Sequence, residues 1–302
     1  MTTPSSSPPQ RLATGEPATA AIAAPGEVTF ILEAGRADRN YWADLWRFRE
    51  LFAILAWRDV AVQYKQTVIG IAWALVRPLL TTLIFTGLFS RIARLPSEGA
   101  TPYPLMVMAG MLPWFLFSTI LTSASGSLTS NSNLISKVYF PRLIIPASAV
   151  ITSMVDFLIT FVLLLIMFVF FQYTPSVRIL FLPFFVLLAF FCAFGIGLYI
   201  TALNVKYRDF RYIIPFVIQF GLYITPVGFS TQVLLSKLPP FFQSVYMLNP
   251  MVGVIDGFRW CFFENTPLSI NTLLYSIGMT TLFMYIGVRT FRKMERHFAD
   301  LI

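Results

Sequence analysis

Five hydrophobic stretches of this chain are each long enough to cross a lipid bilayer, and a sixth is nearly long enough. A helix needs about 20 mostly apolar residues to span the hydrocarbon core. The sequence is 57% hydrophobic and 12% charged, whereas soluble domains carry about 25% charged residues. These features predict an all-α integral membrane protein whose hydrophobic segments occupy most of residues 69–291.

We expect six transmembrane helices. The predicted spans are residues 68–89, 105–128, 143–171, 179–203, 213–229 and 268–288. Residues 233–263 are also apolar, but Pro239, Pro240 and Pro250 interrupt them, so one continuous helix cannot cross the membrane here. Short re-entrant helices fit this stretch better. Re-entrant backbone is tolerated only where protein buries it or water lines it, so we expect a cavity or pore beside it.

The positions of the basic residues indicate the orientation. With both termini in the cytoplasm, the cytoplasmic segments hold 16 of the 22 Lys and Arg residues. The outer segments hold only Arg91, Arg94, Arg178, Lys237 and Arg259. This asymmetry is the positive-inside signal, and an odd number of spans would remove it. The net charge of +8 thus follows topology, and we expect no nucleic-acid partner.

Two segments precede the first predicted span. Residues 1–36 are rich in Ser, Pro, Ala and Thr and are predicted to be a disordered cytoplasmic tail, which leaves 37–302 for the membrane domain. Residues 41–57 carry apolar side chains at helical spacing together with three tryptophans. This pattern favours a helix that lies in the membrane interface. Packing of the helix on the protein's own cytoplasmic surface is the alternative.

Residues that could carry out catalysis are scarce. The motif GxxxxGK[ST] is absent, so the chain does not bind ATP through a P-loop. The only cysteines are Cys192 and Cys261, and no Cys/His spacing typical of a metal site occurs. Within the predicted spans, Arg77 and Asp156 are the intramembrane charges. They are candidates for a transport role, but Arg77 can also extend to the cytoplasmic interface or pair with Asp156.

Two further regions contain candidate site residues. The broken outer stretch carries a group of aromatic side chains, which could stack on sugar rings or form an ordinary aromatic belt at the lipid interface; these are Phe241, Phe242, Tyr246, Trp260, Phe262 and Phe263. Between the second and third spans, Asn131 or Asn133 could cap a short helix that Pro141 ends. Such a helix in a cytoplasmic loop could dock another protein.

Several short motifs make the sequence recognisable. Arg58-Asp59 precedes Gln63-Tyr64-Lys65-Gln66-Thr67, and Asn133-Leu134-Ile135 precedes Lys137-Val138-Tyr139-Phe140-Pro141-Arg142. Further motifs are Ala202-Leu203-Asn204-Val205 with Tyr207-Arg208-Asp209, Thr225-Pro226-Val227, and Leu248-Asn249-Pro250-Met251. In this order, over residues 45–291, they resemble the permease of ABC-2 type exporters of lipid-linked polysaccharides such as O-antigen, capsule and teichoic acid.

The resemblance implies a six-span permease of the bacterial inner membrane with both termini in the cytoplasm. It implies a homodimer that works with two copies of a separate ABC ATPase, which would bind ATP and Mg²⁺, so that this chain needs no cofactor and is not an enzyme. The expected cargo is a polyprenyl-pyrophosphate-linked, O-antigen-like polysaccharide that moves outward among membrane lipids.

The resemblance also suggests three groups of site residues. Residues 131–142 would form a coupling helix seated on the ATPase, with Asn131, Asn133, Leu134, Lys137, Val138, Tyr139, Phe140 and Arg142 as its contacts. The cytoplasmic entrance would attract pyrophosphate through Arg58, Lys65, Arg208 and Arg211, for which structural or topological roles are equally open. The six outer aromatics would line an outer gate and stack on sugars.

Other functions remain open from the sequence. A permease of the same superfamily could export a lipid or a drug, although the motifs around Gln63 and Lys137 favour glycan export. An ion channel or secondary carrier would need no ATPase, but carriers usually contain more intramembrane charge. A membrane glycosyltransferase would generally need acidic sites, and none is visible.

Overall fold

The computed structural model describes residues 41–65, 70–99, 101–207, 209–295 and 298, and within these ranges it contains helices and no strands. This confirms the predicted all-α class. The predicted tail 1–36, the first two residues of the first predicted span, and Gln66, Thr67 and Arg208 lie outside the described residues.

Five helical stretches among the described residues are long and apolar enough to cross a membrane. They are Ala72–Ile92, which comprises most of α3 (Gly70–Thr86) and the π-helix η1 (Gly87–Ile92); α4 (Tyr103–Ser130); Ile144–Phe170, formed by α6 (Ile144–Ala149) and α7 (Ile151–Phe170); Val177–Lys206, formed by the 3₁₀-helix η2 (Val177–Phe181) and α8 (Leu182–Lys206); and α13 (Ile270–Glu295). Each coincides with a predicted span.

The remaining predicted span, 213–229, corresponds to α9 (Phe210–Ile224), which has 15 residues. At a rise of 1.5 Å per residue this helix is about 22 Å long, shorter than the hydrocarbon core of about 30 Å. It ends before Thr225, whose backbone is extended (φ −81°, ψ 151°). The cause is Pro226, because a residue that precedes proline disfavours the helical conformation.

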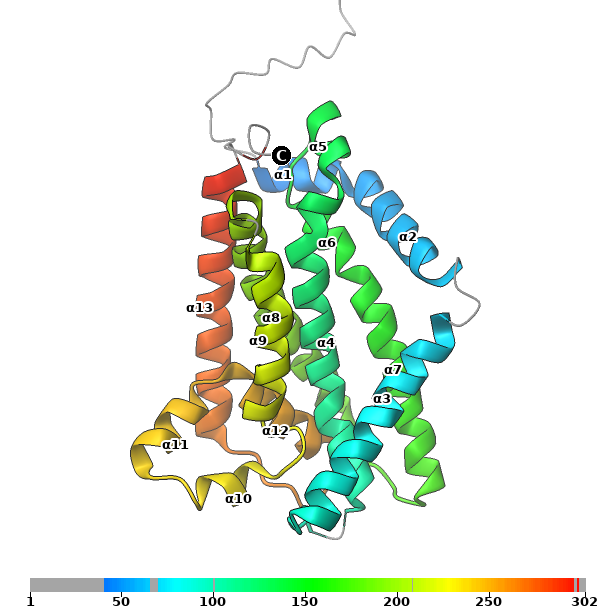
Figure 1. The fold of residues 1–302 in the computed structure, drawn as a ribbon, viewed down its shortest axis with the longest axis vertical. Coiled ribbons are helices and arrows are strands. Elements are labelled where there is room, and N and C mark those ends of the chain that lie inside the picture. Colours follow the sequence, from blue (N-terminus) through cyan, green and yellow to red (C-terminus); the bar gives the residue numbers. More distant parts are fainter. Residues whose placement is uncertain (1–40, 66–69, 100, 208, 296–297, 299–302) are drawn as a thin grey trace, which may run out of the picture. The chain divides into compact units, whose positions relative to one another are not determined.

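Helix α4 forms the centre of the bundle. Its 28 residues include no charged side chain, and most of them are buried. It packs against α3, α7, α8, α9 and α12, and Figure 1 shows it between α8 and α7. Hydroxyl groups within α4 donate to carbonyls three or four residues earlier, as Thr122 does to Ser118, so they need no water. Asn204 of α8, part of a recognised motif, donates to the carbonyl of Ser125 at 2.9 Å.

Short helices occupy the two ends of the bundle. Helices α1 (Tyr41–Arg47), α2 (Arg49–Lys65) and α5 (Ser132–Lys137) lie at one end, and α10 (Thr231–Leu235), α11 (Pro240–Met247) and α12 (Pro250–Phe262) lie at the other (Figure 1). Pro240 and Pro250 each occupy the first position of a helix, where the missing N–H costs nothing. The prolines thus divide the predicted re-entrant stretch into three helices.

Helices α1 and α2 cover residues 41–57, the segment predicted as an interface helix, and together they continue to Lys65. We keep the name interface helix for this pair, while its place in the membrane interface stays a prediction. The apolar positions at helical spacing face the protein, because all of them are buried or partly buried; they are Tyr41, Leu45, Phe48, Phe52 and Leu55. Trp42, Trp46 and Trp57 are exposed by 58%, 71% and 75%. The apolar stripe therefore covers the bundle, and the tryptophans project away from it.

Candidate coupling segment and outer region

The loop between α4 and α6 contains the predicted coupling helix, and we refer to residues 131–142 as the coupling segment. Only α5 (Ser132–Lys137) is helical, and Val138 already has an extended backbone. Ile135 and Phe140 are buried, whereas Val138 and Tyr139 are exposed by 50% and 66%. The segment is thus anchored by two apolar side chains and presents two others to the outside, as a docking element requires.

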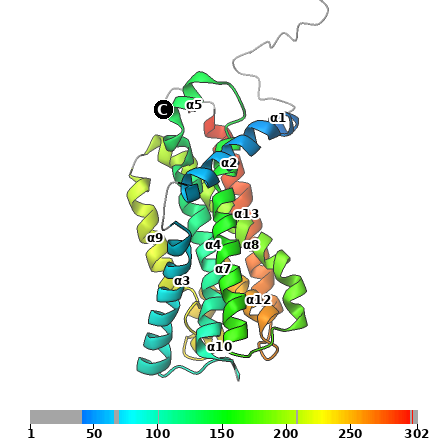
Figure 2. The ribbon, with the colours of Figure 1, turned by 90° about the vertical axis from the view of Figure 1, so that its right-hand side faces the viewer.

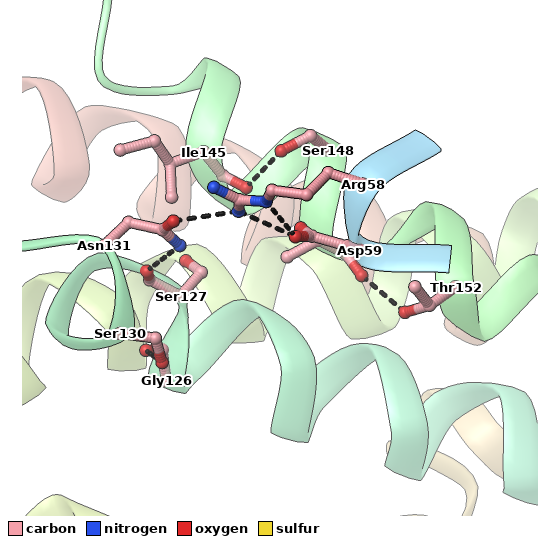
Figure 3. Close-up of polar contacts among 10 residues, drawn as sticks. Arg58, Asp59, Gly126, Ser127, Ser130, Asn131, Ile145, Ser148 and Thr152 are labelled. Atoms are coloured by element: carbon pink, nitrogen blue, oxygen red, sulfur yellow. Dashed lines mark hydrogen bonds and ion pairs between the residues drawn. The ribbon is translucent and has the colours of Figure 1, made fainter. Parts of the chain in front are cut away.

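Asn131 fixes the start of the coupling segment. Its side-chain amide donates to the carbonyl of Ser127 at 2.9 Å, and its side-chain oxygen accepts from the guanidinium of Arg58 in α2 at 2.9 Å (Figure 3). Arg58 also pairs with Asp59 at 2.7 Å. A residue predicted for pyrophosphate and a residue predicted for coupling are therefore in direct contact, and they connect the interface helix to the coupling segment.

Arg142 fixes the other end of the segment. Its backbone N–H donates to the carboxylate of Glu295 at 2.7 Å, and its guanidinium donates to the backbone carbonyl of Glu295 at 2.7 Å. Glu295 belongs to α13, about 150 residues away in sequence. Sequence reasoning did not select Glu295, and a lone acid within the basic stretch 289–296 was the only available signal.

The two intramembrane charges are not paired with each other as the sequence suggested. Asp156 in α7 accepts hydrogen bonds from the side chains of Gln63 (3.1 Å to each oxygen) and Tyr64 in α2. Arg77 in α3 lies over the ring of Phe115, 5.6 Å from its centroid. Asp156 therefore connects the bundle to the end of the interface helix, and its partners Gln63 and Tyr64 belong to one of the motifs recognised in the sequence.

The other residues predicted for the cytoplasmic entrance give less information. Lys65 and Arg211 are both exposed, at the end of α2 and at the start of α9. Arg208 lies outside the described residues. Their role in attracting pyrophosphate stays a prediction.

The predicted gate aromatics separate into two groups. Phe241 and Phe242 in α11 are exposed by 73% and 56%, and Tyr246 on the same helix is partly buried. Phe262 and Phe263 are fully buried. In this conformation only the α11 group is open to a ligand.

The side chain of Trp260 is partly buried, so its exposure lies between those of the two groups. Its ring lies against Phe181 and Phe185, and the guanidinium of Arg178 lies 5.1 Å from the ring centroid. Arg178 also donates to the carbonyl of Glu264 at 3.1 Å. The indole thus has packing partners within its own chain, and sugar stacking by Trp260 stays a prediction.

A buried polar cluster in the outer region was missed by the sequence reasoning, which treated Arg259 as a topology signal. Arg259 is completely buried and donates to the carbonyls of Val227 and Phe229, both at 2.9 Å. Its guanidinium also pairs with Glu98 at 3.3 Å. Asp256, one helical turn before Arg259, accepts a 2.6 Å hydrogen bond from Thr231.

This cluster joins three segments that are distant in sequence. Thr266, which follows α12, donates to the second carboxylate oxygen of Glu98 at 3.0 Å. The hydroxyl of Tyr103 in α4 donates to the carbonyl of Gly228 at 2.6 Å. An acid and a base in an otherwise apolar region was the signal available in the sequence. Among the described residues, no group of three or more His, Cys, Asp or Glu residues could hold a metal ion.

Comparison with known proteins identifies the family. The family model described as ABC-2 type transporter matches residues 50–263. The O-antigen export system permease protein RfbA of Myxococcus xanthus is 23% identical over 86% of this chain and 98% of its own length. The protein of the same name from Klebsiella pneumoniae is 25% identical over 84% and 95%. The polysialic acid transport protein KpsM of Escherichia coli is 22% identical over 79% and 91%. The chain is a multi-pass membrane protein that belongs to the ABC-2 type transporter family.

Proposed function

We propose that this chain is the permease subunit of an ATP-driven exporter that carries a polyprenyl-pyrophosphate-linked polysaccharide from the cytoplasm to the outer face of a bacterial inner membrane. The coupling segment is the observation that carries this proposal. It presents Val138 and Tyr139 outward while both of its ends are bonded to the helical bundle. The relatives named above export O-antigen or transport polysialic acid.

In the proposed mechanism the partner is a pair of ABC ATPase subunits that hold ATP and Mg²⁺. Closure of that pair on ATP binding moves the coupling segments as rigid bodies and shifts the permease between two states. The permease itself has no catalytic step. Its exposed entrance cations Lys65 and Arg211 attract the pyrophosphate group.

A homodimer is supported by one side of the bundle. Helices α3 and α9 lie on that side (Figure 2), and the rings of Phe85 and Tyr223 stack between them at 6.1 Å. Large apolar side chains remain exposed along both helices, including Trp73 by 62% and Phe216 by 60%. A second copy of the chain would cover them and enclose a path for the glycan, next to the exposed rings of α11.

The orientation with both termini in the cytoplasm is supported by the contact between Tyr41 and Glu295, 3.3 Å apart. These residues open the interface helix and close α13, so both lie at the same end of the bundle. An even number of crossings fits this contact, and we assign the sixth crossing to α9.

The proposal is tested by deleting the gene and measuring surface glycan by immunoblot. Loss of surface glycan with accumulation of the lipid-linked polymer inside the cell is expected. Tyr139→Ala should restore neither export nor co-purification of the ATPase, whereas replacement of the exposed outer Lys237 by Gln should restore both. Normal surface glycan in the deletion strain would contradict glycan export and favour a lipid or drug as cargo. Transport by the purified chain without an ATPase would identify a channel or carrier.

A further inference from the structure

Glu295 forms a two-point connection with Arg142, the last residue of the coupling segment. The carboxylate accepts the backbone N–H of Arg142, while the guanidinium of Arg142 donates to the Glu295 backbone carbonyl. Arg142 donates both bonds, one from its backbone to the Glu295 side chain and one from its side chain to the Glu295 backbone. They fix the orientation of Arg142 on α13 as well as its distance, so the end of the coupling segment cannot rotate freely relative to that helix.

The same carboxylate also binds the interface helix. The hydroxyl of Tyr41, the first residue of α1, donates to the Glu295 oxygen that accepts from Arg142. Tyr41 is buried, and the guanidinium of Arg292 lies 4.6 Å from the centroid of its ring. Burial and the neighbouring carboxylate raise the pKa of Tyr41 well above its usual value, so the phenol stays a hydrogen-bond donor. Three elements thus meet at one side chain.

The connection at the other end of the coupling segment is more open to solvent. The side chain of Arg58, which binds Asn131, is 44% exposed. Exposed ion pairs and hydrogen bonds contribute little, since water competes for both partners. Glu295 is partly buried, so its contacts are the more rigid of the two.

Helix α13 continues from this joint to the outer region and is tightly packed along the way. A Cβ on Gly287 would lie 2.1 Å from the carbonyl oxygen of Gly195 in α8, so the two backbones are in direct contact. Further along, a Cβ on Gly253 of α12 would lie 2.9 Å from the carbonyl oxygen of Thr272. Because such close-packed helices transmit displacement, movement of α13 must move α8 and α12 as well.

We propose that Glu295 is a positioning residue that makes the coupling segment, the interface helix and α13 move as one body, so that movement imposed on the coupling segment reaches the outer helices. This inference rests on the proposed function, since it requires an ATPase that moves the segment. It assigns a mechanical role to a side chain outside the recognised motifs, and it names α13 as the route.

The test measures movement at the outer end while ATP hydrolysis is monitored separately. A spin label is placed on Lys237→Cys, which lies between α10 and α11, in the complex with the ATPase; the native cysteines are buried and should not react. Electron–electron resonance then gives the distance between the labels of two copies, with and without trapped ATP and vanadate. Wild type should show a nucleotide-dependent shift.

Glu295→Ala should lose that shift while the ATPase still co-purifies and its hydrolysis rate stays within about twofold. Glu295→Gln should keep most of the shift, since an amide oxygen still accepts from Arg142 and Tyr41. The matched control is Glu50→Ala, which removes an exposed carboxylate from α2. A full shift in Glu295→Ala would overturn the inference and leave the proposed function intact. If wild type neither co-purifies with an ATPase nor shows a nucleotide-dependent shift, the proposed function itself is overturned.

If Glu295→Ala does not assemble, Tyr41→Phe serves in its place. This variant removes one hydrogen bond to the carboxylate and keeps the ring beneath Arg292. A reduced shift at normal ATPase activity supports the joint, and a full shift in this variant overturns it.

Discussion

Arg259 and Val227 are bonded to each other across the outer region, where a guanidinium nitrogen donates to the Val227 carbonyl at 2.9 Å. The stretch from Thr225 to Phe229 is not helical, so the carbonyls of Val227 and Phe229 lack the N–H partners that a helix would supply. Unsatisfied carbonyls are costly away from water, particularly at membrane depth. The fully buried Arg259 supplies the missing donors, and Glu98 supplies the opposite charge.

Replacement of Arg259 is therefore expected to destabilise the protein severely. Arg259→Met leaves the Glu98 carboxylate and two carbonyls without their partner, and loss of one member of a buried pair typically costs about 3–5 kcal/mol. Arg259→Lys should be intermediate, because a single ammonium cannot reach all three acceptors. The loss of stability is measured by thermal unfolding of the detergent-solubilised protein, monitored by size-exclusion chromatography. Lys237→Gln is the exposed control from the same end, and an Arg259→Met variant that unfolds at the wild-type temperature would refute this account.

Asp256 should make the stability of the outer region depend on pH. Burial raises the pKa of Asp256 to about 6, although the hydrogen bond from Thr231 and the charge of Arg259 lower it and Glu98 raises it further. The folded state therefore favours the protonated acid more than the unfolded state does. Its contribution to stability is greatest below the ordinary value of 3.8 and declines as pH rises through 6.

Comparison with Asp256→Asn isolates this effect. The thermal midpoint of wild type minus that of Asp256→Asn should fall between about pH 4 and pH 6 and then stay level. The difference removes contributions from every other titrating group that the substitution leaves unperturbed. A difference that rises over this range would show that the carboxylate is held in its charged form.

The helices that cross the membrane were predictable because their signal is local. Long apolar runs without charge, such as α4, cannot be solvated, and prolines at 240 and 250 set the starts of α11 and α12. The contacts of the polar residues were not predictable. Arg77 and Asp156 looked like partners because both are charges within spans, yet each found a different neighbour.

The same limit applies to the candidate sites. The motif led us to predict Val138 and Tyr139 as coupling contacts, and both side chains are exposed. Their contact with an ATPase stays a prediction. Glu295 and Arg259 act through partners about 150 and 30 residues away. No periodicity or spacing within one segment reports such pairings, because they depend on how α13 and α12 pack on the rest of the bundle.

Tyr64 should hold the end of the interface helix on α7. Its hydroxyl donates to Asp156, and burial together with that carboxylate raises the pKa of Tyr64, so it remains protonated. Tyr64→Phe removes one hydrogen bond to a charged acceptor, worth about 1.5–3 kcal/mol where it is buried and less here because the residue is only partly buried. Hydrogen exchange of residues 58–65 should become faster, while exchange of α13 should not change. Equal exchange in both proteins would mean that Gln63 alone holds the contact.

The contact between Arg58 and Asn131 should govern how firmly the coupling segment is attached at its start. Asn131→Ala removes both the acceptor for Arg58 and the donor to the Ser127 carbonyl. Because Asn131 is partly buried, we expect a loss of about 1 kcal/mol, which corresponds to about fivefold faster hydrogen exchange in residues 132–137. Ser130→Ala, which removes only a bond to the Gly126 carbonyl, is the control.

A double-mutant cycle with Arg58→Ala separates the shared bond from the rest. The two substitutions should be less than additive, because each alone already breaks the bond between them. Asn131→Ala should retain a part of its effect in the Arg58→Ala background, since the Ser127 bond is independent of Arg58. Strict additivity would mean that the two side chains do not interact in solution. The contact through Glu295 and Tyr41 would then carry more of the connection between the interface helix and the coupling segment, and the variants of that joint should become correspondingly more damaging.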